Sequence, residues 1–539
     1  MPTTAHPAHR GKTATDGPTG PPWWLSATFL AVVLAAVRVA MVAVLPYDRA
    51  VGLFDDDAFY YFGIARHIAD GDGSTFNGLD PTNGYHPLWL AVLTPVFAVA
   101  DGRAALVCVT VVSAVLFLAS ARLLDRIGRL TGRPVLATAC AAPLLLLGAA
   151  GPTFWFSGME TGLLLTATLA VAWLFARTDG LRDTGPRQAV LLGVLVTLTV
   201  LARLDAVFPM AVLGVLATVT WMRQRCRRLI AWAAAVPAVV IGTYLAVETS
   251  VFGTAFPVSG QAKALGASGV NVEVLGQFAT DPVVFGVPTL AGLIAIAVML
   301  AARLGAQGRP DPAATFGAVV LAGGALTVGY YALTSSWQLW PWYFSAAPLA
   351  IALSGPAALH RLPESVGRDR VLAAVACVAA LAVVAVTAVR TASGPIARSA
   401  FVADGPAVAA ELETVARGES ADVAVAMGDR AGSVGYHLHR PLVQLEGLVN
   451  SREYLDALLA GTVPAFLAER RVGLYVRGDT EPGRAAPDFG PECRRFFEPA
   501  HGTGPKVPIV VCDPDLVLRH PLLDGTEYRA WRYRVELNR

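Results

Sequence analysis

The sequence predicts a mainly α-helical membrane protein with about 11 membrane-spanning helices and a small C-terminal α/β domain outside the membrane. Three observations lead to this fold class. Of the 539 residues 55% are hydrophobic, the mean hydropathy is +0.53, and 15% are charged, against about 25% in a soluble protein. Apolar runs long enough to cross a membrane as helices follow one another up to about residue 390. Beyond that point the chain turns polar.

The N-terminal segment 1–22 is rich in Pro, Gly and Thr, which predicts a disordered cytoplasmic tail. The apolar run from Trp23 to Pro46 is too long for the core of a signal peptide and lacks a small-residue cleavage site. We therefore keep it as a membrane anchor. It opens a transmembrane domain over residues 23–390, whose first outer loop is expected at 47–86.

The arginines set the predicted topology, because positive residues of short loops stay on the cytoplasmic side. They cluster between apolar runs as Arg122/Arg126/Arg129/Arg133, Arg177/Arg182/Arg187, Arg223/Arg225/Arg227/Arg228, Arg303/Arg309 and Arg361/Arg368/Arg370. The loops between these clusters then face outward, at 156–161, 203–205, 249–281 and 335–343. The run Pro87–Ala100 is short and lies close to the next one, so we expect a partial or interfacial helix there. A multi-pass plasma-membrane protein follows, with its N-terminus inside and its C-terminus outside.

Residues 391–539 are expected to form the extracytoplasmic α/β domain, because short β-type runs alternate with helical patterns. Strands are predicted at Val423–Met427, Leu442–Leu445, Val472–Val476, Pro508–Cys512 and Tyr533–Leu537. Helices are predicted at Ala407–Ala416 and Arg452–Leu459. Cys493 and Cys512 lie in this part and could pair in an oxidising compartment.

Three consecutive aspartates, Asp55, Asp56 and Asp57, follow the first apolar run. Carboxylates at a membrane boundary are costly, and a helix N-cap needs only one of them. An apolar stripe from Ala58 to Ala69 at helical spacing predicts a helix that lies in the membrane interface behind them. Asp56 and Asp57 are the candidate catalytic residues, because a carboxylate near like charges and lipid gains proton affinity and suits a general base.

Other polar and aromatic side chains fall at the predicted outer side and are candidate substrate-binding groups: Asp55, Tyr60, Arg66, His86, Glu160, Arg203, Asp205, Lys263 and Trp340. Structural alternatives stay open for several of them. Arg203 and Asp205 could form an ion pair, Lys263 could snorkel, and Trp340 could belong to an interfacial aromatic belt. No metal site is predicted and no cofactor is expected, although clustered carboxylates leave Mg²⁺ or Mn²⁺ open.

The chain resembles the GT-C superfamily of membrane glycosyltransferases, which includes actinobacterial arabinosyl- and mannosyltransferases and the protein mannosyl- and aminoarabinose-transferase group. The acidic motif Asp56-Asp57-Ala58-Phe59-Tyr60-Tyr61 carries this likeness. So do Thr82-Asn83-Gly84-Tyr85-His86-Pro87-Leu88-Trp89 and Ser157-Gly158-Met159-Glu160-Thr161. The third aspartate, Asp55, departs from the family's acidic pair.

The resemblance implies a hexosyl- or pentosyltransferase that uses a polyprenyl-phosphate sugar at the outer face of the bilayer. Its acceptor would be a hydroxyl of a cell-envelope glycan, lipid or protein, and no nucleic acid is involved. Asp56 or Asp57 would deprotonate that hydroxyl, which attacks the anomeric carbon in line with inversion. Lys263, Arg203 or His86 would stabilise the leaving phosphate.

Two other function classes fit the same residues. A transporter or flippase of lipid-linked sugars could use the carboxylates to couple protons, although the sequence has no inverted repeat. A membrane scaffold could bind glycan through the stretch Met427–Gly432. An enzyme should gather Asp56, Asp57, Lys263 and His86 around one outward cavity, whereas a transporter should show a central pathway.

Overall fold

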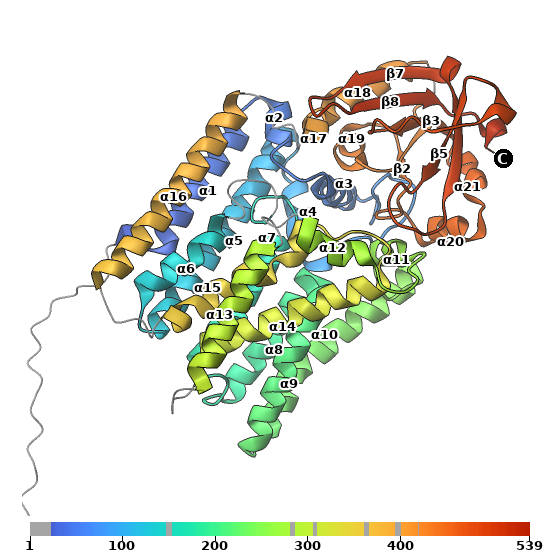
Figure 1. Cartoon of the computed structure of the whole chain (residues 1–539). Coiled ribbons are helices and arrows are strands. Elements are labelled where there is room, and N and C mark those ends of the chain that lie inside the picture. Colours follow the sequence, from blue (N-terminus) through green and yellow to red (C-terminus); the bar gives the residue numbers. More distant parts are fainter. Residues whose placement is uncertain are drawn as a thin grey trace, which may run out of the picture.

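The computed structural model describes residues 23–146, 154–280, 286–304, 310–359, 366–393, 400–418 and 420–538. The predicted disordered segment 1–22 lies outside the described residues, as do Arg309 and Arg361 of the arginine clusters. Figure 1 shows a large helical part and, at one end of it, a sheet-containing C-terminal part. The predicted fold class is confirmed in this coarse form.

The helical part is built from apolar helices joined by short polar turns. They are α1 (Ala27–Val44), α2 (Tyr47–Val51), α3 (Asp56–Asp70), α4 (Pro87–Phe97), α5 (Gly102–Leu130), α6 (Pro134–Leu146), α7 (Thr161–Arg177), α8 (Pro186–Ala202), α9 (Val207–Arg223), α10 (Arg228–Phe252), α11 (Val258–Ala264), α12 (Val272–Thr280), α13 (Val287–Leu304), α14 (Pro312–Thr334), α15 (Ala346–Leu359) and α16 (Val366–Ser393). Short 3₁₀ turns lie at Trp23–Leu25, Leu204–Ala206 and Pro341–Phe344.

Among the described residues, six helical segments are long and apolar enough to cross a membrane. They are Ala27–Val44, Gly102–Leu130, Leu204–Arg223, Arg228–Phe252, Pro312–Thr334 and Pro341–Leu359. Four further apolar helices have 10–17 residues, so each spans about 15–26 Å, short of a ~30 Å hydrocarbon core. One of them is α4, with 11 residues, at the predicted partial helix. The predicted total of about 11 spans therefore stays a prediction.

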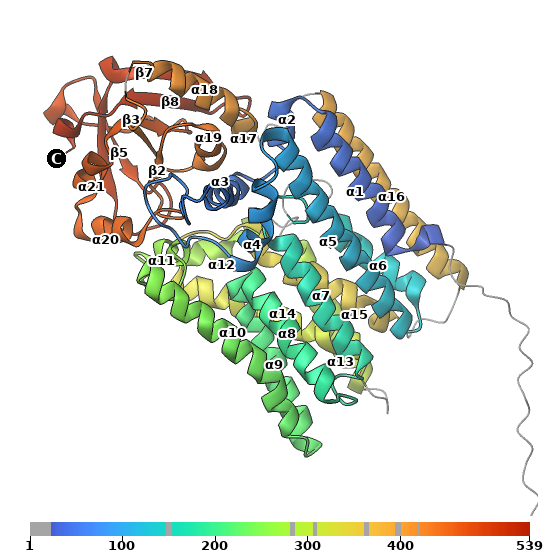
Figure 2. The same ribbon diagram turned by 180° about the vertical axis from the view of Figure 1, so that it is seen from behind.

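Helix α3 is the element that joins the two parts. It ends at Gly71, whose φ of +91° closes the helix in the left-handed conformation. All residues from Ala58 to Ala65 are buried, because α4 covers one side of the helix and α19 (Ala431–His437) covers another. Both views show α3 between these neighbours (Figures 1 and 2). The predicted helix is present at these residues, and the C-terminal part packs against it. Its predicted position in the membrane interface stays a prediction.

The C-terminal part holds two sheets. The first has the strand order β2-β1-β3-β8-β7, with β2, β1 and β3 parallel and with β8 and β7 antiparallel to their neighbours. The second has the antiparallel order β4-β5-β6. The strands are β1 (Ala424–Met427), β2 (Leu442–Gln444), β3 (Val472–Arg477), β4 (Arg484–Ala485), β5 (Cys493–Glu498), β6 (Val507–Cys512), β7 (Leu516–Pro521) and β8 (Glu527–Arg532). The helices are α17 (Ala400–Ala403), α18 (Gly405–Val415), α19, α20 (Arg452–Ala460) and α21 (Val463–Glu469).

Four of the five predicted strands coincide with β1, β2, β3 and β6, and the two predicted helices coincide with α18 and α20. The fifth strand, Tyr533–Leu537, is wrong: β8 ends at Arg532 and Val535–Leu537 forms a 3₁₀ turn. The apolar signal of this stretch comes from packing at the end of the sheet. Cys493 and Cys512 form a disulfide that joins facing positions of β5 and β6.

The core explains why the two parts stay together. Along β1, Val425 and Met427 belong to a cluster that also contains Phe59 of α3 and Trp89 of α4. Ala424 and Ala426 belong to a different cluster on the other side of the sheet, as the two-residue period of a strand requires. One hydrophobic core therefore runs from the helical part into the C-terminal part.

Candidate active site

A pocket lies where α3, loops of the helical part and the C-terminal part meet. It contains about 540 Å³ of space not filled by atoms, part of it open to solvent. Its lining residues are Asp57, Tyr60, Tyr61, Ile64, Gly84, Tyr85, His86, Met159, Glu160, Arg203, Ser259, Lys263, Trp342, Tyr343, Leu448 and Val449. Residues from seven separate stretches of the sequence thus converge on one space.

Helix α3 contributes one complete face to this pocket. Asp57, Tyr60, Tyr61 and Ile64 follow the spacing i, i+3, i+4 and i+7, which places them on one side of an α-helix. Burial raises the pKa of Asp57 to about 6, and the nearby Lys263 ammonium works against this rise. Asp57 is therefore a carboxylate with increased proton affinity that faces the pocket.

Asp56 faces a different neighbour. Its Oδ2 accepts the backbone N–H of Gly432 and its Oδ1 that of Ser433, both at 2.8 Å. Burial raises the pKa of Asp56 to about 7, although the two N–H donors oppose the change. Asp55 occupies the N-cap position of α3 and interacts electrostatically with the buried Arg38 of α1. Among the residues that line the pocket, neither Asp55 nor Asp56 is present.

A buried charge network forms the wall opposite α3. Arg203 donates through Nη1 to Glu160 Oε1 at 3.0 Å and through Nε to both oxygens of Asp205 at 2.9 and 3.1 Å. Its guanidinium also stacks on the Tyr343 ring, 4.3 Å from the centroid. Glu160 and Asp205 were both candidate substrate-binding groups. The structure shows the Arg203–Asp205 ion pair that the sequence left open as the structural alternative. Arg203 is thus held by two carboxylates.

His86 joins this network from the loop before α4. Its Nδ1 accepts the Leu204 backbone N–H at 3.3 Å, so a neutral ring carries its proton on Nε2, which lies 3.8 Å from Glu160 Oε1. Burial lowers the pKa of His86, with the Glu160 carboxylate opposing. The imidazole is therefore a neutral hydrogen-bond donor at neutral pH.

Lys263 of α11 supplies the second cation of the pocket. Its Nζ lies 3.4 Å from the Tyr343 hydroxyl and close to the rings of Trp337 and Tyr343. Burial alone would lower the pKa of Lys263, but Tyr343 and the Asp57 carboxylate raise it above its ordinary value. Within the described part of the chain, no carboxylate lies within ion-pair distance of this ammonium. Its charge is more available than that of Arg203.

Some candidates lie elsewhere. The Arg66 guanidinium stacks on Tyr436 of α19, 4.7 Å from the ring centroid, at the contact between the two parts. Trp340 stacks on Trp342 with centroids 5.9 Å apart but does not line the pocket. The structure thus gathers Asp57, Tyr60, His86, Glu160, Arg203 and Lys263 in the pocket. Five candidates do not line it: Asp55, Asp56, Arg66, Asp205 and Trp340.

Tyr61, Ser259 and Tyr343 line the pocket and were not candidates. Tyr61 could have been found from its position one helical turn after Asp57. Its hydroxyl accepts the backbone N–H of His86 at 3.1 Å, so it links α3 to the loop before α4. Tyr343 belongs to the same aromatic run as the candidate Trp340, and Ser259 carries no comparable signal. Only the tertiary structure brings α11 and the Pro341–Phe344 turn to α3.

An adjoining space of about 490 Å³, part of it open to solvent, shares Arg203, Trp342 and Tyr343 with the pocket. Asp205 lies at the same end of it. The rest of its wall is mostly apolar and comes from α7, α14 and α15, with Leu164, Leu165, Val320, Ala346 and Leu349. A polar space and an apolar space therefore meet at one arginine and two aromatic rings.

The fold of the chain is similar to that of solved structures. ArnT from Cupriavidus metallidurans in the apo state superposes with a TM-score of 0.53 at 14% identity, over 94% of this chain and 98% of that chain. The chain has the GT-C fold.

Two further solved structures are similar to this chain at low identity. ArnT bound to undecaprenyl phosphate gives a TM-score of 0.50 at 14% identity, with the same coverage of 94% and 98%. The oligosaccharyltransferase of Archaeoglobus fulgidus in the apo form gives 0.49 at 12% identity, over 85% of this chain and 70% of that chain. No protein-family model matches the sequence, and no curated protein sequence matches it either. The resemblance predicted from the sequence is confirmed at the level of the fold.

Proposed function

We propose that this protein is a membrane glycosyltransferase that moves a sugar from a polyprenyl-phosphate donor to an acceptor hydroxyl, with inversion at the anomeric carbon. The observation that carries the proposal is the meeting of two spaces at Arg203, Trp342 and Tyr343. A donor of this class has a charged phosphate and sugar at one end and a long apolar chain at the other. The polar pocket fits the first, and the apolar cavity fits the start of the second.

Asp57 is the group we assign as general base. It faces the pocket from α3, and its raised pKa of about 6 lets it accept a proton at neutral pH while it remains largely ionised. The acceptor hydroxyl gives its proton to Asp57, and its oxygen forms a bond to the anomeric carbon. The bond from that carbon to the phosphate oxygen breaks, and the electron pair leaves with the polyprenyl phosphate. A single displacement of this kind inverts the configuration.

Lys263 is the group we assign to the leaving phosphate. Its ammonium has no carboxylate partner at ion-pair distance among the described residues, whereas Arg203 is bonded to Glu160 and Asp205. A cation fixed where negative charge develops lowers the barrier without reorganisation. Arg203 and the neutral His86 then orient the phosphate or the sugar rather than neutralise the leaving charge.

The reaction is assigned to the outer membrane face. The Cys493–Cys512 disulfide supports this side for the C-terminal part, because disulfides persist in oxidising compartments. The arginines between α9 and α10, Arg223, Arg225, Arg227 and Arg228, fit a cytoplasmic turn. The ArnT structure with undecaprenyl phosphate supports a lipid-phosphate donor for a chain of this fold. The acceptor is a hydroxyl of a cell-envelope glycan, lipid or protein.

The proposal is tested with two matched variants, Asp57→Asn and Asp56→Asn, in membranes supplied with polyprenyl-phosphate sugars. We expect Asp57→Asn to lose about 10²–10⁴ in the rate of transfer, the usual contribution of a general base. Asp56→Asn, which keeps one oxygen for a backbone N–H of α19, should stay within about tenfold of wild type. Full transfer by Asp57→Asn would overturn the assignment of the base, and full transfer by both variants would overturn the proposed mechanism.

A further inference from the structure

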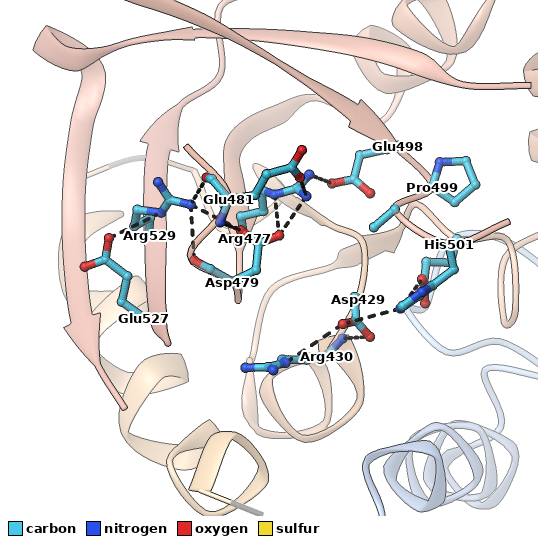
Figure 3. Close-up of polar contacts among 12 residues, drawn as sticks. Asp429, Arg430, Arg477, Asp479, Glu481, Glu498, Pro499, His501, Glu527 and Arg529 are labelled. Carbon is cyan, nitrogen blue, oxygen red and sulfur yellow. Dashed lines mark hydrogen bonds and ion pairs between the residues drawn. The ribbon is translucent and has the colours of Figure 1, made fainter. Parts of the chain in front are cut away.

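The C-terminal part brings three potential metal ligands to one edge of its first sheet. Asp429 follows β1, Glu446 follows β2, and His501 lies in the loop after β5. Strands β1 and β2 are parallel neighbours, so their carboxyl ends meet at the same edge, which is where ligands commonly bind to such sheets. Figure 3 shows Asp429 and His501 pointing toward each other at this edge.

The distances between the ligand atoms suit a metal ion. His501 Nε2 lies 3.6 Å from Asp429 Oδ2 and 3.9 Å from Glu446 Oε1, and the ligand atoms all lie within 4.8 Å of one another. In a tetrahedral site with bonds of about 2.1 Å, neighbouring ligand atoms are about 3.4 Å apart. Small side-chain adjustments would therefore close the three groups around one ion. This is the one such group of three or more His, Cys, Asp or Glu side chains in the described residues.

A second, independent observation comes from Glu446. Its side chain is 3% exposed, and its Oε1 is buried with no hydrogen-bond partner among the described residues. The other oxygen, Oε2, accepts a bond from Gln444 Nε2 at 3.3 Å. A buried carboxylate oxygen without a partner costs free energy. A cation between Glu446 and His501 would satisfy this oxygen.

The surroundings hold the ligands in place. Lys506 Nζ donates to the carbonyl oxygens of Pro499, Ala500 and His501 at 2.6, 3.3 and 2.9 Å, which fixes the loop that carries the imidazole. Trp337, from the loop between α14 and α15, packs on the His501 ring with centroids 5.5 Å apart. The imidazole is thus held from the C-terminal part and from the helical part at once.

One neighbouring cation competes for Asp429. Arg430 Nε lies 3.9 Å from Asp429 Oδ2, but its Nη1 donates to Thr526 at 2.8 Å and lies 3.6 Å from Asp524. The Arg430 backbone N–H occupies the other oxygen, Oδ1, at 2.9 Å. Asp429 Oδ2 therefore remains directed at His501, with Arg430 turned mainly to the β7–β8 turn.

We propose that Asp429, Glu446 and His501 bind one divalent transition-metal ion, of which Zn²⁺ fits best. One imidazole and two carboxylates suit Zn²⁺ or Mn²⁺, whereas Mg²⁺ prefers oxygen ligands alone. The ion would join three loops of the C-terminal part. Leu448 and Val449, which follow Glu446 by two and three residues, line the pocket, so the ion would also stabilise that wall. The site does not depend on the proposed glycosyl transfer.

The test measures metal content of the full-length protein in detergent, purified with an affinity tag that contains no histidine. After treatment with EDTA, the protein is dialysed against Zn²⁺, Mn²⁺ or Mg²⁺, and bound metal is counted by mass spectrometry. Wild type should retain about one Zn²⁺ per chain, and Glu446→Gln and His501→Ala should retain at least about tenfold less. X-ray absorption of the zinc form should show one imidazole nitrogen at about 2.0–2.1 Å with oxygen neighbours.

Matched controls come from the same domain. His520 lies 3.1 Å from Glu411, and Glu413 bonds to Arg440 at 3.1 Å, so His520→Ala and Glu413→Gln should bind as much Zn²⁺ as wild type. Zn²⁺ should raise the Tm of metal-free wild type and leave that of His501→Ala unchanged, which separates lost binding from lost folding. Equal zinc in His501→Ala and wild type, binding of Mg²⁺ alone, or no uptake by wild type would each overturn the proposal.

Discussion

Two faces of helix α3 differ in what they contact, although their residues alternate along one short sequence. Asp57, Tyr60, Tyr61 and Ile64 line the pocket. Asp56 and Phe59 lie on a second face, which contacts the C-terminal part and is called the docking face. Asp56 bonds there to the backbone of α19, and Phe59 packs against Tyr436 and His437. Consecutive residues of an α-helix point about 100° apart. Two adjacent aspartates of one motif therefore have unlike environments: Asp57 lines the pocket, and Asp56 is bonded to the C-terminal part.

The largest effect is expected on the docking face, from Phe59→Ala. Phe59 is fully buried, with ring centroids 5.2 Å from Phe62 and 5.5 Å from Tyr436. Truncation should reduce the free energy of unfolding by about 3–5 kcal/mol, measured by thermal and denaturant unfolding in detergent. On the pocket face, Ile64→Val should cost only about 0.5–1.5 kcal/mol. Equal losses in the two variants would contradict the idea that α3 docks the C-terminal part through one face.

The next effect concerns the cation of the pocket. Lys263→Met removes the ammonium assigned to the leaving phosphate, so kcat/KM for the lipid-linked sugar should fall about 10²–10³. Arg66→Met is the matched control, because Arg66 stacks on Tyr436 outside the pocket. Its kcat/KM should stay within about tenfold of wild type. A larger loss of kcat/KM in Arg66→Met than in Lys263→Met would contradict the assignment of Lys263 to the leaving phosphate.

The pH profile gives a third, graded test. Burial raises the pKa of Asp57 to about 6; Asp429 and Glu160 add to the rise, and Lys263 and His501 oppose it. A general base must be ionised, so kcat/KM should fall about tenfold per pH unit below about pH 6 and level off above it. In Lys263→Met the inflection should move to higher pH, because the cation that favours the ionised carboxylate is gone. An unchanged inflection in that variant would separate Asp57 from the titration.

The smallest effect is expected from Asp56→Ala. This change leaves the backbone N–H groups of Gly432 and Ser433 without their acceptor, which should reduce the free energy of unfolding by about 1–3 kcal/mol. Asp57→Ala removes no hydrogen bond of this kind and should be closer to wild type in stability. Thermal unfolding of both variants, side by side, checks the order. The reverse order would place the structural carboxylate at Asp57.

The sequence alone determined the membrane character, the existence of the C-terminal α/β part, most of its strands and the resemblance to the GT-C fold. These features rest on hydrophobic runs and local periodicity, which any stretch of chain carries by itself. The sequence also identified five candidate residues that line the pocket, because ionisable groups beside apolar runs cost free energy and therefore indicate a function. They are Asp57, His86, Glu160, Arg203 and Lys263. Their common pocket could be expected, but its geometry could not.

Only the tertiary structure decided which aspartate faces the pocket. The choice depends on α19, about 375 residues further along the chain, whose backbone N–H groups bind Asp56 and so leave the next position of the helix to the pocket. It also decided that α19 of the C-terminal part covers one side of α3. Asp429, Glu446 and His501, the proposed metal ligands, meet for the same reason. The parallel pairing of β1 and β2 brings the loops after these strands to one edge, and this pairing joins segments that are distant in the sequence.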